Sequence, residues 1–106
     1  MNHNRGDIYT ALYPFDDMDK EKLRPSLIFD TRDQYSIVIK LTSHEERSND
    51  DGDIEIKYWE EAGLDFPSVA RCSDSIPLHH DKIKKFIGVL HKEDMINVLE
   101  KMYSSK

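Results

Sequence analysis

The sequence predicts a mainly β domain, a small barrel of about six short strands followed by one α-helix. Short apolar runs alternate with polar, turn-like segments over residues 7–78, a pattern typical of small barrels and not of layered α/β folds. In the tail the apolar spacing changes from every second residue to every third or fourth, which indicates a helix. A chain of 106 residues suits one domain, residues 1–106.

The first half of the chain contains three expected strands. Residues 7–13 (DIYTALY) alternate as a half-buried strand does, and the charged segment 14–22 is expected to be an exposed, mobile loop. Two strongly apolar strands follow, residues 24–30 (RPSLIFD) and 35–41 (YSIVIKL). The consecutive apolar residues 37–39 indicate a central strand, covered on both faces.

The second half begins with a polar loop over residues 44–53. Residues 54–58 show the clearest two-residue alternation in the chain and are expected to form a strand. We expect a short helical turn over residues 59–64, ending at the glycine, and two further short strands over 69–73 and 75–78. These segments complete the expected barrel.

The C-terminal helix is expected to be roughly 12 residues long. Glu93 and Asp94 in its first turn and Lys101 near its end match the helix dipole. His91, at the expected cap position, belongs to a weakly capping residue type, so we expect the first turn to fray. The apolar residues with helical spacing are Met95, Val98, Leu99, Met102 and Tyr103.

Composition narrows the classes of function. The formal net charge of −6 argues against indiscriminate binding to nucleic acid, but it allows a local basic cleft. No apolar run approaches the length of a membrane span, and the start MNHNRGD lacks the apolar core of a signal peptide. The single cysteine, Cys72, cannot form an internal disulfide. Together these features favour a cytoplasmic protein that does not bind membranes.

Several short motifs follow one another along the chain, and their order and spacing resemble those of the PemK/MazF family, the toxins of bacterial toxin–antitoxin pairs. The resemblance covers nearly the whole chain. The motifs are Arg5-Gly6-Asp7-Ile8, Arg24-Pro25, Leu41-Thr42-Ser43, Trp59-x-x-Ala62-Gly63-Leu64-x-x-Pro67-Ser68-Val69 and Ile87-Gly88-x-Leu90.

The resemblance implies an SH3-like β-barrel of the PemK/CcdB type with a C-terminal α-helix, paired as a homodimer. It also implies an endoribonuclease that needs no metal or other cofactor. Such toxins cut single-stranded RNA, including mRNA, to cyclic phosphate and 5′-hydroxyl ends. A cognate antitoxin protein neutralises them, and they bind DNA only indirectly, through that antitoxin. Two alternatives stay open, a non-catalytic binding module and a toxin that poisons DNA gyrase.

Cleavage of RNA through its own 2′ hydroxyl needs a base, an acid and a cation that stabilises the charge on the phosphorane. Arg24 matches the catalytic arginine of the family. Its planar guanidinium can make paired hydrogen bonds to two phosphate oxygens, and Pro25 would stiffen the backbone that carries it. The alternative interpretation is an exposed ion pair, for example with Glu21.

Thr42 occupies the position of the family's catalytic threonine, and Ser43 is a possible helper. The alternative is a strand-ending Thr-Ser pair that caps the backbone of the following loop. His44 is a candidate for RNA binding, because imidazole titrates near neutral pH, although a loop histidine is more often simply solvated.

Arg71 and Asp74 are candidates for an acid–base pair. Some family members carry Arg-Cys-Asp at this place, with acid and base roles assigned to the arginine and the aspartate. Here Ser73 replaces that aspartate, and Asp74 follows one residue later. A shift of one residue turns a strand side chain to the opposite face, so Asp74 can join Arg71 only if a bulge re-aims it.

Lys82, Lys84 and Lys85 form the densest basic cluster, a candidate surface for RNA phosphates or an acidic antitoxin, or else a solvated run of charge. The recognised bases cannot be read from the sequence, and we expect recognition to depend on loops 14–23 and 44–53. No metal site is expected from His79, His80 and Cys72, because a fourth ligand is lacking. The aromatic residues expected in the core or at a dimer seam are Trp59, Phe66, Phe86, Tyr9 and Tyr13.

Overall fold

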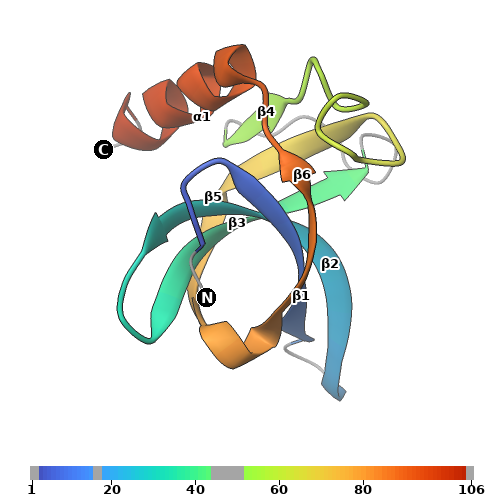
Figure 1. Ribbon diagram of the computed structural model, residues 1–106, viewed down its shortest axis with the longest axis vertical. Coiled ribbons are helices and arrows are strands. Elements are labelled where there is room, and N and C mark those ends of the chain that lie inside the picture. The colour runs from blue at the N-terminus through green and yellow to red at the C-terminus, as the bar shows by residue number, and fades with distance from the viewer. Residues whose placement is uncertain (1–2, 16–17, 44–51, 105–106) are drawn as a thin grey trace.

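The computed structural model describes residues 3–15, 18–43 and 52–104. In this part of the chain, six strands form one curved antiparallel sheet with the order β4-β5-β3-β2-β1-β6, and helix α1 lies across one side of it (Figure 1). The elements are β1 (Asp7–Phe15), β2 (Met18–Thr31), β3 (Tyr35–Ser43), β4 (Asp53–Glu55), β5 (Ser68–His79), the short 3-10 helix η2 (His80–Lys82), β6 (Ile83–Val89) and α1 (Lys92–Ser104).

The expected mainly β fold with a C-terminal helix is confirmed, and β3 is central as predicted, between β5 and β2. The sheet is not closed, however. Among the described residues, β4 and β6 are its two edges, so the strands curve around a core without completing a hydrogen-bonded barrel. No helix in the described part of the chain is long and apolar enough to span a bilayer.

The prediction of a loop over residues 14–22 is wrong. β1 continues to Phe15 and β2 already begins at Met18, with Pro14 paired to Glu21 and Tyr13 paired to Lys22. Strand pairing is made by the backbone, so a charged segment can extend a hairpin wherever its partner strand continues beside it. The charged residues of this segment therefore do not indicate where β1 ends.

The strand expected over residues 54–58 is shorter, because β4 ends at Glu55. The Ile56 N–H still donates to the Ser68 carbonyl of β5 at 2.9 Å, but the N–H groups of Lys57 and Tyr58 donate to the Asp94 carboxylate at 2.9 Å each and so leave the sheet. The turn expected over residues 59–64 is present. The Leu64 N–H closes it with a bond of 3.1 Å to the Trp59 carbonyl.

The two strands expected over residues 69–78 form one continuous strand, β5. Its pairing with β3 shifts register between Ile39 and Lys40, and this irregularity interrupts the alternation that suggested two strands. Strand β6 was not expected. It pairs with β1 at the sheet edge, and because most of its side chains are exposed it lacks a clear apolar alternation.

Two apolar clusters hold the fold together, one on each face of the sheet. One lies between the sheet and α1, and the other lies inside the curve of the sheet. The buried members of the first are Ile8, Leu27, Ile39, Leu41, Ile56, Ala62, Leu64, Ala70, Cys72, Leu90 and Val98. The buried members of the second are Tyr9, Ala11, Tyr13, Ile28, Val38, Leu78 and Ile83.

Helix α1 spans 13 residues, close to the expected length. The expectation of a weak cap at His91 is wrong. The His91 Nδ1 accepts a hydrogen bond from the Glu93 N–H at 3.1 Å, and its ring stacks on Tyr58 with 3.9 Å between the ring centroids. The imidazole thus satisfies a free N–H of the first turn, as a serine or aspartate would.

Asp94 is fully buried. Through its hydrogen bonds to the Lys57 and Tyr58 N–H groups it holds the first turn of α1 against the segment that follows β4. We expect Asp94→Ala to lower the free energy of unfolding by about 2 kcal/mol, because it leaves two buried N–H groups without an acceptor. Urea denaturation measures the loss. The neighbouring exposed residue supplies the control, since Glu93→Ala should change the free energy by less than about 0.5 kcal/mol. If both variants lowered the free energy of unfolding by the same small amount, the Asp94 hydrogen bonds would not stabilise the fold.

Candidate functional site

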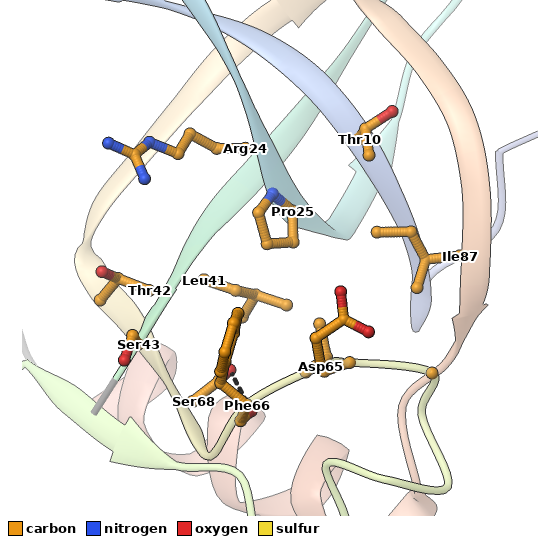
Figure 2. Close-up of a pocket in the computed structure, with 12 residues that line it drawn as sticks. Thr10, Arg24, Pro25, Leu41, Thr42, Ser43, Asp65, Phe66, Ser68 and Ile87 are labelled. Atoms are coloured by element: carbon orange, nitrogen blue, oxygen red, sulfur yellow. Dashed lines mark hydrogen bonds between the residues drawn. The ribbon is translucent and has the colours of Figure 1, made fainter. Parts of the chain in front are cut away.

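A pocket of about 250 Å³ opens where β2 and β3 separate. The described ladder between these strands ends at Ser26 paired with Lys40. Pro25 follows in the ladder direction, and a proline has no N–H with which to continue it. The residues beyond this point are therefore free to line a pocket. They include Arg24, Pro25, Leu41, Thr42 and Ser43 (Figure 2).

Arg24 is held by the β1–β2 hairpin, where it pairs with Ala11. Its side chain is partly exposed, but its Nε is buried and has no hydrogen-bond partner among the described residues. A buried guanidinium N–H without an acceptor is costly, and an arriving anion would satisfy it. The Arg24 Nε–H therefore offers a hydrogen bond that no described residue accepts.

Thr42 and Ser43 enter the pocket from the end of β3. Ser26 pairs with Lys40, so the side chains two residues further along each strand, Arg24 and Thr42, project to the same face of the sheet. Figure 2 shows the Thr42 hydroxyl and the Arg24 guanidinium on the same side of Pro25. The structure thus brings together three of the predicted site residues in one pocket.

The segment after the 59–64 turn forms the opposite wall. Asp65 and Phe66 line the pocket, and Phe66 is 63% exposed. Phe66 was expected in the core or at a dimer seam, and the core assignment is wrong. Phe86 is likewise half-exposed, whereas Tyr9 and Tyr13 are buried and Trp59 packs against the core as expected.

The sequence reasoning did not select Asp65. The available signal was the motif Ala62-Gly63-Leu64-x-x-Pro67-Ser68, in which Asp65 and Phe66 are the two unspecified positions. Because the motif that carried the family resemblance specifies no residue type at these two positions, it gave no reason to select them.

Arg71 and Asp74 lie outside the pocket lining, but they form an ion pair. The Arg71 Nη1 lies 2.8 Å from the Asp74 Oδ2, and its Nε lies 3.9 Å from the Asp53 Oδ1. Lys40 pairs with Arg71 while its neighbour Ile39 pairs with Ser75, so the residues between have no partner on β3. This irregularity meets the condition for Asp74 to be re-aimed toward Arg71.

The predicted RNA-binding residues are not gathered in the pocket. His44 lies outside the described residues. Lys82 belongs to η2, and Lys84 and Lys85 are exposed on the edge strand β6. None of these three lysines lines the pocket.

Two buried groups in the core, Tyr13 and Cys72, have strongly shifted pKa values. Burial raises the pKa of Tyr13 to about 12 and that of Cys72 to about 11. Both groups therefore stay protonated at neutral pH, and neither lines the pocket. Neither can serve as a base in a reaction at neutral pH.

A family model described as "PemK-like, MazF-like toxin of type II toxin-antitoxin system" matches residues 4–105. Among solved structures, the chain is similar to the Mycobacterium tuberculosis toxin MazF-mt6. The identity is 21%, the TM-score is 0.70, and the alignment covers 92% of this chain and 93% of that one. No curated protein matches the sequence.

Proposed function

Because the chain belongs to the family of PemK-like, MazF-like toxins of type II toxin–antitoxin systems, we propose that it is an endoribonuclease acting on single-stranded RNA. The single observation that carries the proposal is the shared pocket of Arg24 and Thr42. A guanidinium with a buried, unsatisfied N–H beside a hydroxyl suits a phosphodiester, which offers several acceptor oxygens to both groups.

In the proposed reaction, a base takes the proton of the 2′ hydroxyl as its oxygen attacks the adjacent phosphorus, and an acid gives a proton to the 5′ oxygen as its bond to phosphorus breaks. The products are a 2′,3′-cyclic phosphate and a free 5′ hydroxyl. Since the nucleophile is already attached to the substrate, the reaction does not need a metal-activated water. Arg24 stabilises the negative charge that develops on the phosphorane oxygens, and Thr42 donates to one of them with Ser43 beside it.

Arg71 and Asp74 have a supporting role in this proposal. Their ion pair, together with Asp53, balances most of the Arg71 charge, so Arg71 contributes less to phosphate binding than Arg24 does. Lys84 and Lys85 would hold the phosphates of a longer strand.

Membership of a type II family implies an antitoxin protein as partner and MazF-like dimers. We propose that the cognate antitoxin covers the pocket and so prevents RNA binding. Contact with DNA would then be indirect, through the antitoxin. The site of action would be the cytoplasm, where its RNA substrate is found.

The test is incubation of the purified protein with several unrelated single-stranded RNAs in excess chelator, followed by analysis of the fragment ends. We expect fragments with 5′ hydroxyls and cyclic phosphates. RNA that stays intact with a folded protein would contradict the proposal. If the protein nevertheless bound that RNA, the non-catalytic binding module would take its place.

A further inference from the structure

We propose that Asp65 and Phe66 form a base-recognition subsite that selects a guanine next to the scissile phosphate. The inference rests on the proposed ribonuclease function and extends it to the choice of substrate. It begins from the two-sided composition of the pocket. Arg24, Thr42 and Ser43 lie toward one end of the pocket and Asp65 lies toward the other, with Phe66 between them (Figure 2).

The two sides are separated by Pro25. In Figure 2 the Asp65 carboxylate lies between Pro25 and Ile87, while the Arg24 guanidinium and the Thr42 hydroxyl lie beyond Pro25. Asp65 makes no ion pair or hydrogen bond with the residues that the structure describes, so Arg24 does not neutralise it. A nucleotide likewise carries its phosphate and its base apart, so in this proposal the phosphate lies at Arg24 and the base at Asp65.

The wall that carries Asp65 and Phe66 is fixed before any ligand arrives. The Ser68 hydroxyl donates to the Phe66 carbonyl at 2.8 Å, drawn as the dashed line in Figure 2. Pro67 restricts the backbone of Phe66 to extended conformations. A large apolar side chain that is exposed on a rigid backbone is suited to contact a ligand, because it loses little entropy on binding.

The chemistry of the wall fits a base. Aromatic side chains stack on unpaired bases in single-stranded RNA, and polar groups then read the Watson–Crick edge. Ile87, which is partly exposed, adds apolar surface for the flat face of the ring. Asp65 is left to contact the edge of the base.

A carboxylate accepts hydrogen bonds only, through two oxygens. On its Watson–Crick edge, guanine presents two adjacent donors, the N1–H and the N2 amino group, and so can bind both oxygens. Adenine and cytosine present one amino group next to an acceptor nitrogen, which repels a carboxylate. Uracil presents one N–H between two carbonyls. Asp65 therefore favours guanine over the other three bases.

Asp65→Asn tests the inference, because the amide keeps the shape of the side chain but replaces one acceptor by a donor. The full chain is incubated with a random pool of single-stranded RNA, and the new 5′-hydroxyl ends are sequenced. We expect guanine to be enriched at one position beside the cut for the wild type. In the variant this enrichment should fall about tenfold or more while cleavage continues.

The control is Asp81→Asn, a change of the same kind in η2, where the side chain is 87% exposed and outside the pocket. It should leave the guanine preference intact. Phe66→Ala should weaken RNA binding whichever base is present, whereas Phe86→Ala, another half-exposed aromatic outside the pocket, should not.

Three outcomes would overturn the inference: a wild type without guanine enrichment, an Asp65→Asn variant that keeps it, or a folded Asp65→Asn variant that cuts no RNA at all. The last would make Asp65 a participant in the chemical step. Binding of the four 5′-mononucleotides, followed by NMR, gives a readout independent of cleavage. Selective binding of guanosine monophosphate by a protein that cuts no RNA would support the subsite and reject the ribonuclease.

Discussion

Arg24→Ala is expected to reduce RNA cleavage at least about a hundredfold, the usual effect of removing a group that stabilises transition-state charge. The melting temperature should change little. The Nε of Arg24 is buried without a partner among the described residues, so its removal takes away a cost and not a contact. Cleavage rates under single-turnover conditions, together with a thermal melt of the same samples, separate the two effects.

Two further variants sharpen this experiment. Arg32→Ala removes an arginine that is 58% exposed and paired with Asp30 at 2.9 Å, and it should leave cleavage unchanged. Arg24→Lys keeps the charge but loses the planar fork, so we expect activity between that of the wild type and that of Arg24→Ala. If Arg24→Ala cut RNA at the wild-type rate, Arg24 would have no role in the reaction.

Much of the fold could be predicted from local patterns. The run of Ile37, Val38 and Ile39 identified the central strand, because a strand buried on both faces needs apolar residues at every position. The spacing of Met95, Val98 and Met102 likewise identified the helix. In both cases the apolar pattern lies within one strand or helix and depends only on which of its own side chains are buried.

Features that depend on two distant segments could not be predicted. The chain leaves the sheet after Ile56 because Asp94, far along the chain, accepts hydrogen bonds from the Lys57 and Tyr58 N–H groups. The exposure of Phe66 depends on how the 59–64 turn packs, which the composition of the turn does not indicate.

The candidate site likewise has residues that local motifs predicted and a residue that they did not. Arg24, Thr42 and Ser43 were found through motifs, and the structure adds that one pocket holds all three. The register of β2 and β3 explains why, since it projects Arg24 and Thr42 to one face at the point where the strands part. No local pattern indicated Asp65, because its place in the pocket comes from the packing of a turn against β6.

That packing depends on Gly88. A Cβ at this position would lie 2.2 Å from the Ala62 carbonyl oxygen and 2.9 Å from its carbonyl carbon. Both atoms belong to the backbone of the 59–64 turn, so no side-chain rotation can relieve the clash. Gly63 in the same turn has φ +89° and also approaches β6 closely, since a Cβ on it would lie 2.8 Å from the Ile87 carbonyl oxygen. The turn and β6 therefore fit together only where both glycines lack side chains.

We expect Gly88→Ala to lower the free energy of unfolding by about 3 kcal/mol or more, a large value for one added methyl group. For a domain of this size the melting temperature should fall by roughly 10 to 20 °C. Val89→Ala, at the next residue of the same strand, is the control, because Val89 is 55% exposed and should tolerate truncation. A Gly88→Ala protein that melts within about 2 °C of the wild type would show that the turn can move away freely.

The same substitution links stability to the site. If the turn shifts to admit the methyl group, it carries Asp65 and Phe66 with it, while Arg24 and Thr42 stay on β2 and β3. Well below its melting temperature, the Gly88→Ala protein should therefore still cut RNA but lose its preference for guanine. Loss of all cleavage in the folded variant would instead mean that the turn also supports the position of the scissile phosphate, because the two walls of the pocket would then move together.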